Sequence, residues 1–259
     1  MLIPFSKYHG TGNDFIMIDN RGPDLRLSQG RVAKLCDRRF GIGADGLILL
    51  EMKERTVHMV YFNADGLKGS LCGNGARCFV RFAGSLDVLS DSGEFLTSDG
   101  PHSYTMQNEL VCLRMNDVAG IESIGNDIFL DTGSPHYIRI VNQLDGSDVV
   151  KEGRAIRYND RFSQNGTNVN FVEMVNGLMC IRTYERGVED ETLSCGTGAT
   201  ASAIALHHIG LTADTDVQVK VLGGDLKVTF SPDGNGHYSD VRLIGPAEKV
   251  YDGTIELRP

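Results

Sequence analysis

The sequence lacks tryptophan, and none of its apolar runs is long enough to cross a membrane. Its 259 residues are 41% hydrophobic, include 31 glycines and carry a net charge of −9. This composition predicts a soluble, turn-rich globular protein. The first ten residues also lack the cationic start and apolar stretch of a secretory signal. We therefore expect a cytoplasmic location, in which the six cysteines remain thiols.

Several binding functions are excluded by what else is missing. No cluster of lysines and arginines interrupts the acidic composition, so we expect neither a nucleic acid nor a membrane as partner. The chain has no Cys-x-x-Cys pair, and the spacing of its cysteines and seven histidines does not fit zinc. No lysine motif for pyridoxal phosphate is evident either. We therefore expect no metal and no cofactor.

The most informative feature that is present is an internal repeat. The run Cys72-Gly73-Asn74-Gly75-Ala76 returns about half a chain later as Cys195-Gly196-Thr197-Gly198-Ala199. Thr11-Gly12-Asn13 and Thr132-Gly133-Ser134 precede the two runs in nearly the same register. The repeat predicts two related domains. We expect an N-terminal domain over 1–117, joined by the closing segment 248–259, and a second domain over 118–247.

Hydrophobic patterns predict more strands than helices. Helices are expected at 28–38, 75–86, 147–158 and 198–209. Strands are expected at 59–63, 94–97, 111–115, 128–132, 137–141, 169–175 and 179–184, with a hairpin over 217–222 and 226–230. There is no regular alternation of strand and helix. The fold class is therefore predicted to be α+β, with two pseudo-symmetric domains in which a mostly antiparallel or mixed sheet surrounds a central helix.

The position of two cysteines points to acid/base chemistry. A Gly-rich turn that enters a helix presents backbone N–H groups and the positive end of the helix dipole, which favour a thiolate. Cys72 and Cys195 lie in such turns. One of them could remove a proton from a carbon atom as thiolate, while the other delivers a proton to the opposite face as thiol. The cysteines that lack this setting are expected to be buried apolar residues: Cys36, Cys78, Cys112 and Cys180.

Other polar residues lie in the duplicated framework. His136 could adjust the pKa of a thiol. Arg186 could hold a carboxylate and Glu185 an ammonium, so that together they would bind a zwitterion. The glycines over 41–46 match a dinucleotide-binding pattern, but a cationic helix precedes them and a strand follows. Nucleotide binding therefore stays a minor alternative.

Eight motifs, in order along nearly the whole chain, resemble those of the diaminopimelate epimerase family. The motifs are His9-Gly10-Thr11-Gly12-Asn13-Asp14-Phe15, Phe40-Gly41-Ile42-Gly43-Ala44-Asp45-Gly46, Asn63-Ala64-Asp65-Gly66, Cys72-Gly73-Asn74-Gly75-Ala76-Arg77, Gly133-Ser134-Pro135-His136, Asn168-Val169-Asn170-Phe171, Glu185-Arg186-Gly187 and Glu191-Thr192-Leu193-Ser194-Cys195-Gly196-Thr197-Gly198. The family interconverts LL- and meso-diaminopimelate without pyridoxal phosphate, on the pathway to lysine and peptidoglycan.

The resemblance implies that Cys72 and Cys195 are the catalytic acid/base pair, with His136 and Glu185 near the thiols. It implies that the substrate-binding residues are Asn13, Asn63, Gly73, Asn74, Asn168, Glu185, Arg186, Gly196 and Thr197. It further implies two similar halves, each a curved sheet around a central helix, that close on the substrate. A homodimer is expected from the resemblance alone.

Three departures from the family pattern affect the expected substrate contacts. Gly46 stands where some members carry glutamine, Ser134 replaces an asparagine, and the loop over 187–191 is one residue longer than usual. Three other functions remain alternatives: a proline or hydroxyproline racemase, a thiol redox protein, and a non-catalytic amino-acid-binding protein. Deuterium uptake at Cα under reducing conditions distinguishes an epimerase from the last two.

Overall fold

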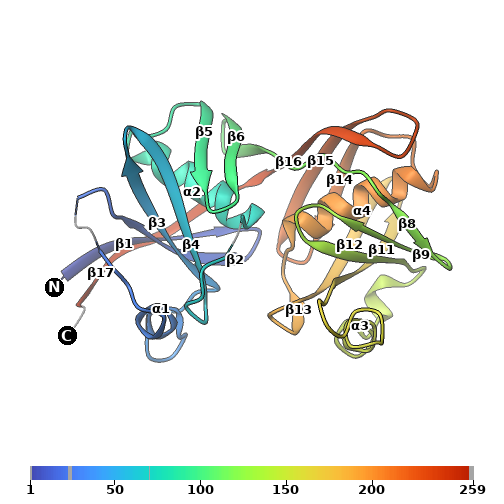
Figure 1. Cartoon of the computed structure of the whole chain (residues 1–259), viewed down its shortest axis with the longest axis horizontal. Helices are drawn as coiled ribbons and strands as arrows, with labels where there is room; N and C mark the ends of the chain where they lie inside the picture. The colour runs from blue at the N-terminus through green and yellow to red at the C-terminus, as the bar shows by residue number, and fades with distance from the viewer. Residues whose placement is uncertain (1, 23–24, 70, 257–259) are drawn as a thin grey trace. The chain divides into compact units, whose positions relative to one another are not determined.

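The structure is a computed structural model that describes residues 2–22, 25–69 and 71–256. Its contacts divide the chain into two compact units. Unit 1 consists of Met1–Leu113 and Gly245–Pro259, and unit 2 consists of Arg114–Ile244. Matching the sequence repeat had placed these boundaries after 117 and 247. Each unit combines a mixed sheet with helices, as Figure 1 shows, and this confirms the predicted fold class.

Unit 1 contains β1 (Leu2–Gly10), β2 (Asn13–Asp19), α1 (Gln29–Cys36), β3 (Gly46–Lys53), β4 (Thr56–Asn63), α2 (Gly73–Ser85), β5 (Ser92–Thr97), β6 (Gly100–Gln107), β7 (Leu110–Arg114) and β17 (Glu248–Glu256). Unit 2 contains β8 (Glu122–Ile124), β9 (Asp127–Asp131), β10 (Pro135–Ile140), the short 3-10 helix η1 (Leu144–Gly146), α3 (Val149–Arg157), β11 (Asn168–Val175), β12 (Leu178–Glu185), β13 (Asp190–Thr192), α4 (Gly196–His208), β14 (Asp216–Val221), β15 (Gly224–Pro232) and β16 (Tyr238–Pro246).

The two units repeat one order of strand pairings. In unit 1, β1 and β2 are antiparallel, β2 and β3 parallel, β3 and β4 antiparallel, and β4 and β5 parallel, and β6 and β7 follow as antiparallel strands. In unit 2, the strands β9 to β12, β14, β15 and β16 pair in this same order. β17 adds to β1, and β8 adds to β9, both antiparallel. The repeat in the sequence is therefore also a repeat of topology.

The core of unit 1 covers both faces of β2 and β3. Ile16 and Leu47 pack in one cluster with Val32 of α1. Phe15 and Ile48 point to the opposite face, where they lie close to the start of α2. A strand that is buried on both faces reads as a continuous apolar run instead of an alternating one. The run over 15–18 therefore gave no clear strand signal, and β2 was absent from the sequence interpretation, whereas β3 confirms the strand expected after the glycines over 41–46.

α2 and α4 are the central helices of their units (Figure 1). Most of their residues are buried, and each helix has a cysteine with extended backbone at its N-cap, Cys72 at φ −105° and Cys195 at φ −123°. The helices begin at Gly73 and Gly196, before the predicted starts at 75 and 198. Those predicted starts were wrong because the first glycine of each run was interpreted as a turn residue. It is the first helical residue instead.

The turn that follows α1 requires a glycine at position 41. The backbone N–H groups of Ile42 and Gly43 both donate to the carbonyl oxygen of Leu35, at 2.9 and 3.1 Å, and fold the chain back against the helix. A Cβ atom at Gly41 would overlap the carbonyl oxygen of Lys34 and would lie 2.6 Å from that of Leu35. These backbone atoms have no room to move without breaking the turn.

We predict that Gly41→Ala destabilises the protein by about 2 kcal/mol or more, because the new methyl group displaces the turn. Gly30→Ala is the matched control, since nothing lies within 4 Å of a Cβ there and the residue is in α1. Alanine should stabilise that helix by about 0.5 kcal/mol. Urea unfolding measures both variants. Equal stability of the two variants would contradict the tight packing of this turn.

Candidate active site

Four candidate residues of unit 1 meet at the start of α2. We call Asn13, Cys72, Gly73, Asn74 and Arg77 half-site 1. The thiol of Cys72 lies 3.7 Å from Oδ1 of Asn13 and can donate to it, and Nδ2 of Asn74 donates to the same oxygen at 3.2 Å. Asn13 reaches this position because the β1–β2 turn is tight. The left-handed backbone of Thr11 (φ 50°) and Gly12 (φ 86°) closes that turn.

Arg77 is a fully buried cation beneath the start of α2. Its guanidinium donates to the carbonyl oxygens of Gly73 at 3.3 Å and Pro246 at 3.2 Å, and to Oδ1 of Asn74 at 3.0 Å. Burial lowers the pKa of Arg77 to about 10, and the electrostatic interactions with Cys78 and Cys72 act in the opposite direction. Arg77 therefore stays charged at neutral pH, and its charge attracts a thiolate at Cys72.

Unit 2 presents the corresponding arrangement at the start of α4. We call His136, Asn170, Cys195, Gly196 and Thr197 half-site 2. Cys195 is buried, and its Sγ lies 3.5 Å from Oγ1 of Thr197. A Cβ on Gly198 would lie 2.5 Å from Oδ1 of Asn170 and 3.3 Å from both Sγ of Cys195 and Cε1 of His136. Glycine at 198 therefore lets Asn170 and His136 pack directly against the helix start.

His136 is a neutral imidazole with a defined tautomer. Burial lowers the pKa of His136 to about 3, the charge of Arg186 lowers it further, and a hydrogen bond with Asn170 opposes both. Asn170 accepts from Oγ1 of Thr183 at 3.0 Å, so its amide nitrogen faces Nδ1 of His136 at 3.1 Å. Nδ1 is then an acceptor and Nε2 carries the proton. Nε2 is buried and has no hydrogen-bond partner among the described residues.

The remaining candidates of unit 2 lie at the ends of β11 and β12. Oδ1 of Asn168 accepts from the backbone N–H of Arg186 at 2.9 Å, and the guanidinium of Arg186 donates to the carbonyl oxygen of Asn165. Glu185 accepts from Oγ1 of Thr192 at 2.8 Å. Arg186 is exposed while Asn168 is buried. The structure thus brings Asn168 and Arg186 together, and the positive charge of Arg186 lowers the pKa of His136.

Asn63 and Gly46 are neighbours across the sheet. They are register partners on β4 and β3, and Phe15 of β2 pairs with Gly46 on its other side. Asn63 is exposed at the end of its strand. A Cβ on Gly46 would lie 2.6 Å from the ring of Tyr61 and 2.7 Å from the carbonyl oxygen of Phe62. Tyr61 therefore occupies the space that a glutamine side chain would need at position 46.

Three of the other cysteines, Cys36, Cys78 and Cys180, lie in settings that disfavour a thiolate. Burial raises the pKa of Cys36 to about 12 and raises the pKa of Cys78 and Cys180 as well. Residues 2–22, 25–69 and 71–256 contain no group of three or more His, Cys, Asp or Glu side chains that could hold a metal ion. Within the same ranges, every helix is too short or too polar to span a membrane.

Two residues of the half-sites were missed by sequence reasoning. Asn170, which fixes the tautomer of His136, lies two positions after the predicted Asn168 on β11, and its side chain is fully buried. The sequence indicated Asn170 only through its position in the motif Asn168-Val169-Asn170-Phe171. Arg77 was quoted only as part of a motif, although the structure shows it as the buried cation of half-site 1.

The sequence is similar to that of diaminopimelate epimerases along almost its whole length. A sequence model of the family described as diaminopimelate epimerase matches residues 5–116 and 128–250. The diaminopimelate epimerase of Flavobacterium psychrophilum is 48% identical over 253 residues, which cover 96% of this chain and 98% of that protein. The diaminopimelate epimerase of Chlorobaculum tepidum is 45% identical over 259 residues, which cover 96% and 99%.

Solved structures with low sequence identity share the fold. A phenazine biosynthesis protein of the PhzF family from Bacillus anthracis matches with a TM-score of 0.78 at 14% identity, covering 99% of this chain and 100% of the other. A hydroxyproline epimerase from Agrobacterium vitis matches with a TM-score of 0.71 at 13% identity, covering 98% and 92%. At these identities the likeness shows the two-unit architecture alone.

The neutral state of His136 predicts a specific loss of stability in acid. Between about pH 3 and 6.5 the unfolded chain binds a proton at this residue and the folded chain does not, so stability falls as pH falls from 6.5. Between pH 6.5 and 5 we expect wild type to lose about 2 kcal/mol more than His136→Gln. Urea unfolding at the two pH values measures this difference. Parallel losses in the two proteins would show that His136 is not held neutral.

Proposed function

The chain belongs to the diaminopimelate epimerase family, and we propose that it inverts the Cα stereocentre of LL-2,6-diaminopimelate to give meso-diaminopimelate. The protein is then an isomerase of lysine and peptidoglycan precursor biosynthesis. The observation that carries this proposal is the pair of cysteine N-caps, one at the central helix of each repeated unit. Domain 1–117 with 248–259 would supply one thiol, and domain 118–247 the other.

Cys72 and Cys195 act as the two bases of the reaction. One removes the Cα proton as thiolate, and the other, as thiol, delivers a proton to the opposite face of the same carbon. The roles exchange in the reverse direction, so that each thiol serves as acid for one isomer and as base for the other. No pyridoxal phosphate takes part in this mechanism. Neither cysteine side chain forms a capping hydrogen bond with its own helix.

The starts of α2 and α4 stabilise the carbanion. A Cα proton is very weakly acidic, so the negative charge that spreads into the α-carboxylate must be strongly stabilised. The backbone N–H groups at Gly73, Asn74, Gly196 and Thr197 lie in the first turns of the two helices, where the helix dipole favours an anion. These residues bind the reacting carboxylate, and the buried charge of Arg77 adds to the positive potential on the unit 1 side.

Polar side chains hold the amino and carboxylate groups of the substrate, including those of the distal centre that does not react. They are Asn13, Asn63, Asn168, Glu185 and Arg186. The exposed guanidinium of Arg186 suits a carboxylate, and the carboxylate of Glu185 suits an ammonium. A substrate with a second zwitterionic end uses both. This distinguishes diaminopimelate from proline or hydroxyproline, which have one such end.

His136 and Glu185 have an accessory role beside Cys195. The neutral imidazole of His136 keeps its proton on Nε2, so it offers a donor that stabilises a thiolate without adding a charge. Glu185 lies on the same strand end as Arg186 and is held by Thr192. We further propose that the protein is a cytoplasmic homodimer that needs neither a metal nor a nucleic acid or membrane partner.

The proposal predicts the behaviour of cysteine variants with LL-diaminopimelate. Proton NMR in D2O, on reduced protein, follows deuterium entry at Cα and formation of the meso isomer. Wild type should exchange and invert. Cys72→Ala and Cys195→Ala should each lose inversion by at least about a hundredfold, because each removes one of the two proton-transfer groups. Cys112→Ser is the matched control, since Cys112 is a half-buried cysteine of β7 with no assigned role.

Each contrary outcome identifies a different rival. Binding of diaminopimelate to wild type without deuterium uptake would mean a non-catalytic binding protein. Inversion of L-proline or trans-4-hydroxy-L-proline in place of diaminopimelate would indicate the racemase alternative. A protein whose thiols cycle with oxidants but never exchange the Cα proton would be a redox protein. Full activity in either alanine variant would contradict the two-base mechanism.

A further inference from the structure

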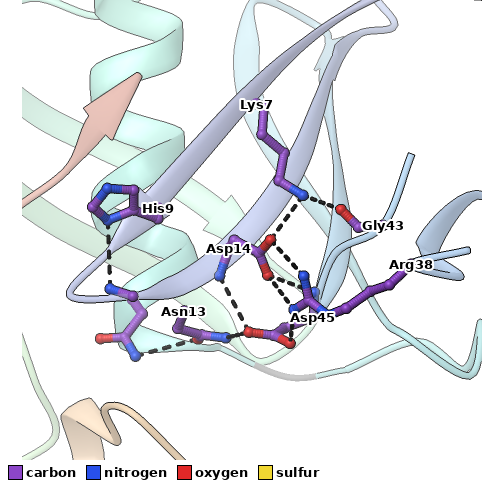
Figure 2. A network of polar contacts seen from close by, with 9 residues as sticks. Lys7, His9, Asn13, Asp14, Arg38, Gly43 and Asp45 are labelled. Atoms are coloured by element: carbon purple, nitrogen blue, oxygen red, sulfur yellow. Dashed lines mark hydrogen bonds and ion pairs between the residues drawn. The ribbon is translucent and has the colours of Figure 1, made fainter. Parts of the chain in front are cut away.

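Asn13 carries an amide whose orientation decides what faces Cys72. One end of the amide is an acceptor and the other a donor, and only the surrounding hydrogen bonds can tell which end points where. The oxygen of the Asn13 amide faces Cys72, and its nitrogen faces a group of charged residues that Figure 2 shows. We call Lys7, Asp14, Arg38 and Asp45 the anchoring cluster. The anchoring cluster fixes the orientation of the Asn13 amide through the amide nitrogen, and Arg77 fixes it through Asn74 at the amide oxygen.

Asp45 is the acceptor end of this chain of hydrogen bonds. Its Oδ2 accepts from Nδ2 of Asn13 at 2.8 Å and from the backbone N–H of Asp14 at 3.2 Å. A carboxylate accepts only, so the amide nitrogen of Asn13 must point toward Asp45. The guanidinium of Arg38 donates to Oδ1 of Asp45 at 2.6 Å and to both carboxylate oxygens of Asp14, at 2.7 and 3.0 Å. Arg38 thereby holds Asp45 in place.

The anchoring cluster is tied into the fold at a second point. Lys7 of β1 pairs with Asp14 at 2.8 Å and donates to the carbonyl oxygen of Gly43 in the turn after α1. Burial raises the pKa of Asp14, but hydrogen bonds from Arg38 and Lys7 outweigh it and leave the pKa at about 2. Asp14 is therefore ionised at neutral pH. Asn13 and Asp14 of β2 and Arg38 of the α1–β3 connection contact Asp45 directly, and Lys7 of β1 holds Asp14.

Arg77 is the donor end of the same chain. It donates to Oδ1 of Asn74 at 3.0 Å, so the amide nitrogen of Asn74 must face Asn13, to whose Oδ1 it donates at 3.2 Å. The order Arg77, Asn74, Asn13, Asp45, Arg38 thus runs from one cation to another, with every donor facing an acceptor. No amide in this chain can turn over without placing two donors or two acceptors against each other.

We propose that Asp45, held by Arg38, is a positioning residue that locks the Asn13 amide with its oxygen toward Cys72. This oxygen accepts the S–H of the thiol at 3.7 Å and opposes the thiolate that Arg77 favours. The same oxygen is the correct group to accept from a substrate ammonium, and this last role rests on the proposed function. Asp45 thus sets the balance between thiol and thiolate at Cys72 without contacting it.

Asp45→Asn tests the lock. In this variant the charge of Arg38 favours the oxygen of the new amide, so the nitrogen of the new amide faces Nδ2 of Asn13. The wild-type orientation of the Asn13 amide then loses its advantage over the turned one, in which Nδ2 of Asn13 faces Nδ2 of Asn74. In the turned orientation Cys72 meets a donor in place of an acceptor. The pH midpoint of Cys72 alkylation by iodoacetamide, followed by mass spectrometry of its peptide, should fall by about one unit. This readout needs no substrate, so it separates the lock from the proposed function.

Asp14→Asn is the charge-matched control. It removes one negative charge from the same cluster and leaves the bond between Asn13 and Asp45 intact. Its midpoint should shift less than that of Asp45→Asn. Equal shifts would overturn the proposal, because they would mean that Asp45 acts through its charge alone. An unchanged midpoint in Asp45→Asn would overturn it as well.

The double variant Asn13→Asp with Asp45→Asn exchanges the two residues and keeps net charge and composition. It tests the lock if Asp45→Asn alone does not fold. The carboxylate that replaces the Asn13 amide accepts at both ends, so the midpoint should return to the wild-type value or above. A midpoint as low as that expected for Asp45→Asn would contradict the lock. The double variant leaves the other charged or titratable groups near Cys72 unchanged. These groups are Arg77 and Cys78 on α2, and Lys7, His9, Asp14, Tyr61 and Glu248 on the strands packed against α2.

Discussion

The structure depends on one constraint, which is that the N-terminus of a central helix is buried inside each unit with a cysteine as its N-cap. A buried helix start concentrates backbone donors and the positive end of the dipole where water is scarce. Glycine follows each cysteine, and Gly75 and Gly198 lie where a side chain would collide with neighbouring strands. The close packing around the helix start therefore explains why both sequence runs have the pattern Cys-Gly-x-Gly.

The two half-sites solve the same problem with different side chains. Half-site 1 uses a charged scheme, in which Arg77 and Asp45 orient two amides around Cys72. Half-site 2 uses a neutral scheme, in which Thr183 and Asn170 orient an uncharged imidazole beside Cys195. A reaction that exchanges the roles of two thiols does not require identical surroundings. The proposed reaction requires only that each thiol can be both acid and base, a balance that the two schemes would adjust separately.

Local patterns predicted the parts of the fold that local chemistry determines. The helices at 28–38 and 147–158 are confirmed as α1 and α3, whose N-cap side chains Ser28 and Asp148 are visible in the sequence. β2 was missed because both of its faces are buried. The hydrogen bonds from Asn13 to Asp45 and from Arg77 to Asn74 could not be predicted in detail. The first joins β2 to the α1–β3 connection, and the second depends on how deeply α2 is buried.

The central claim is that two thiols act on opposite faces of one carbon. The most direct measurement is the isotope content of both isomers at low conversion in D2O, by mass spectrometry after chiral separation. Two bases predict deuterium at Cα of newly formed meso-diaminopimelate, while the remaining LL isomer keeps its original proton. Equal deuterium in both isomers at early times would mean that one exchangeable base serves both faces, and it would contradict the account.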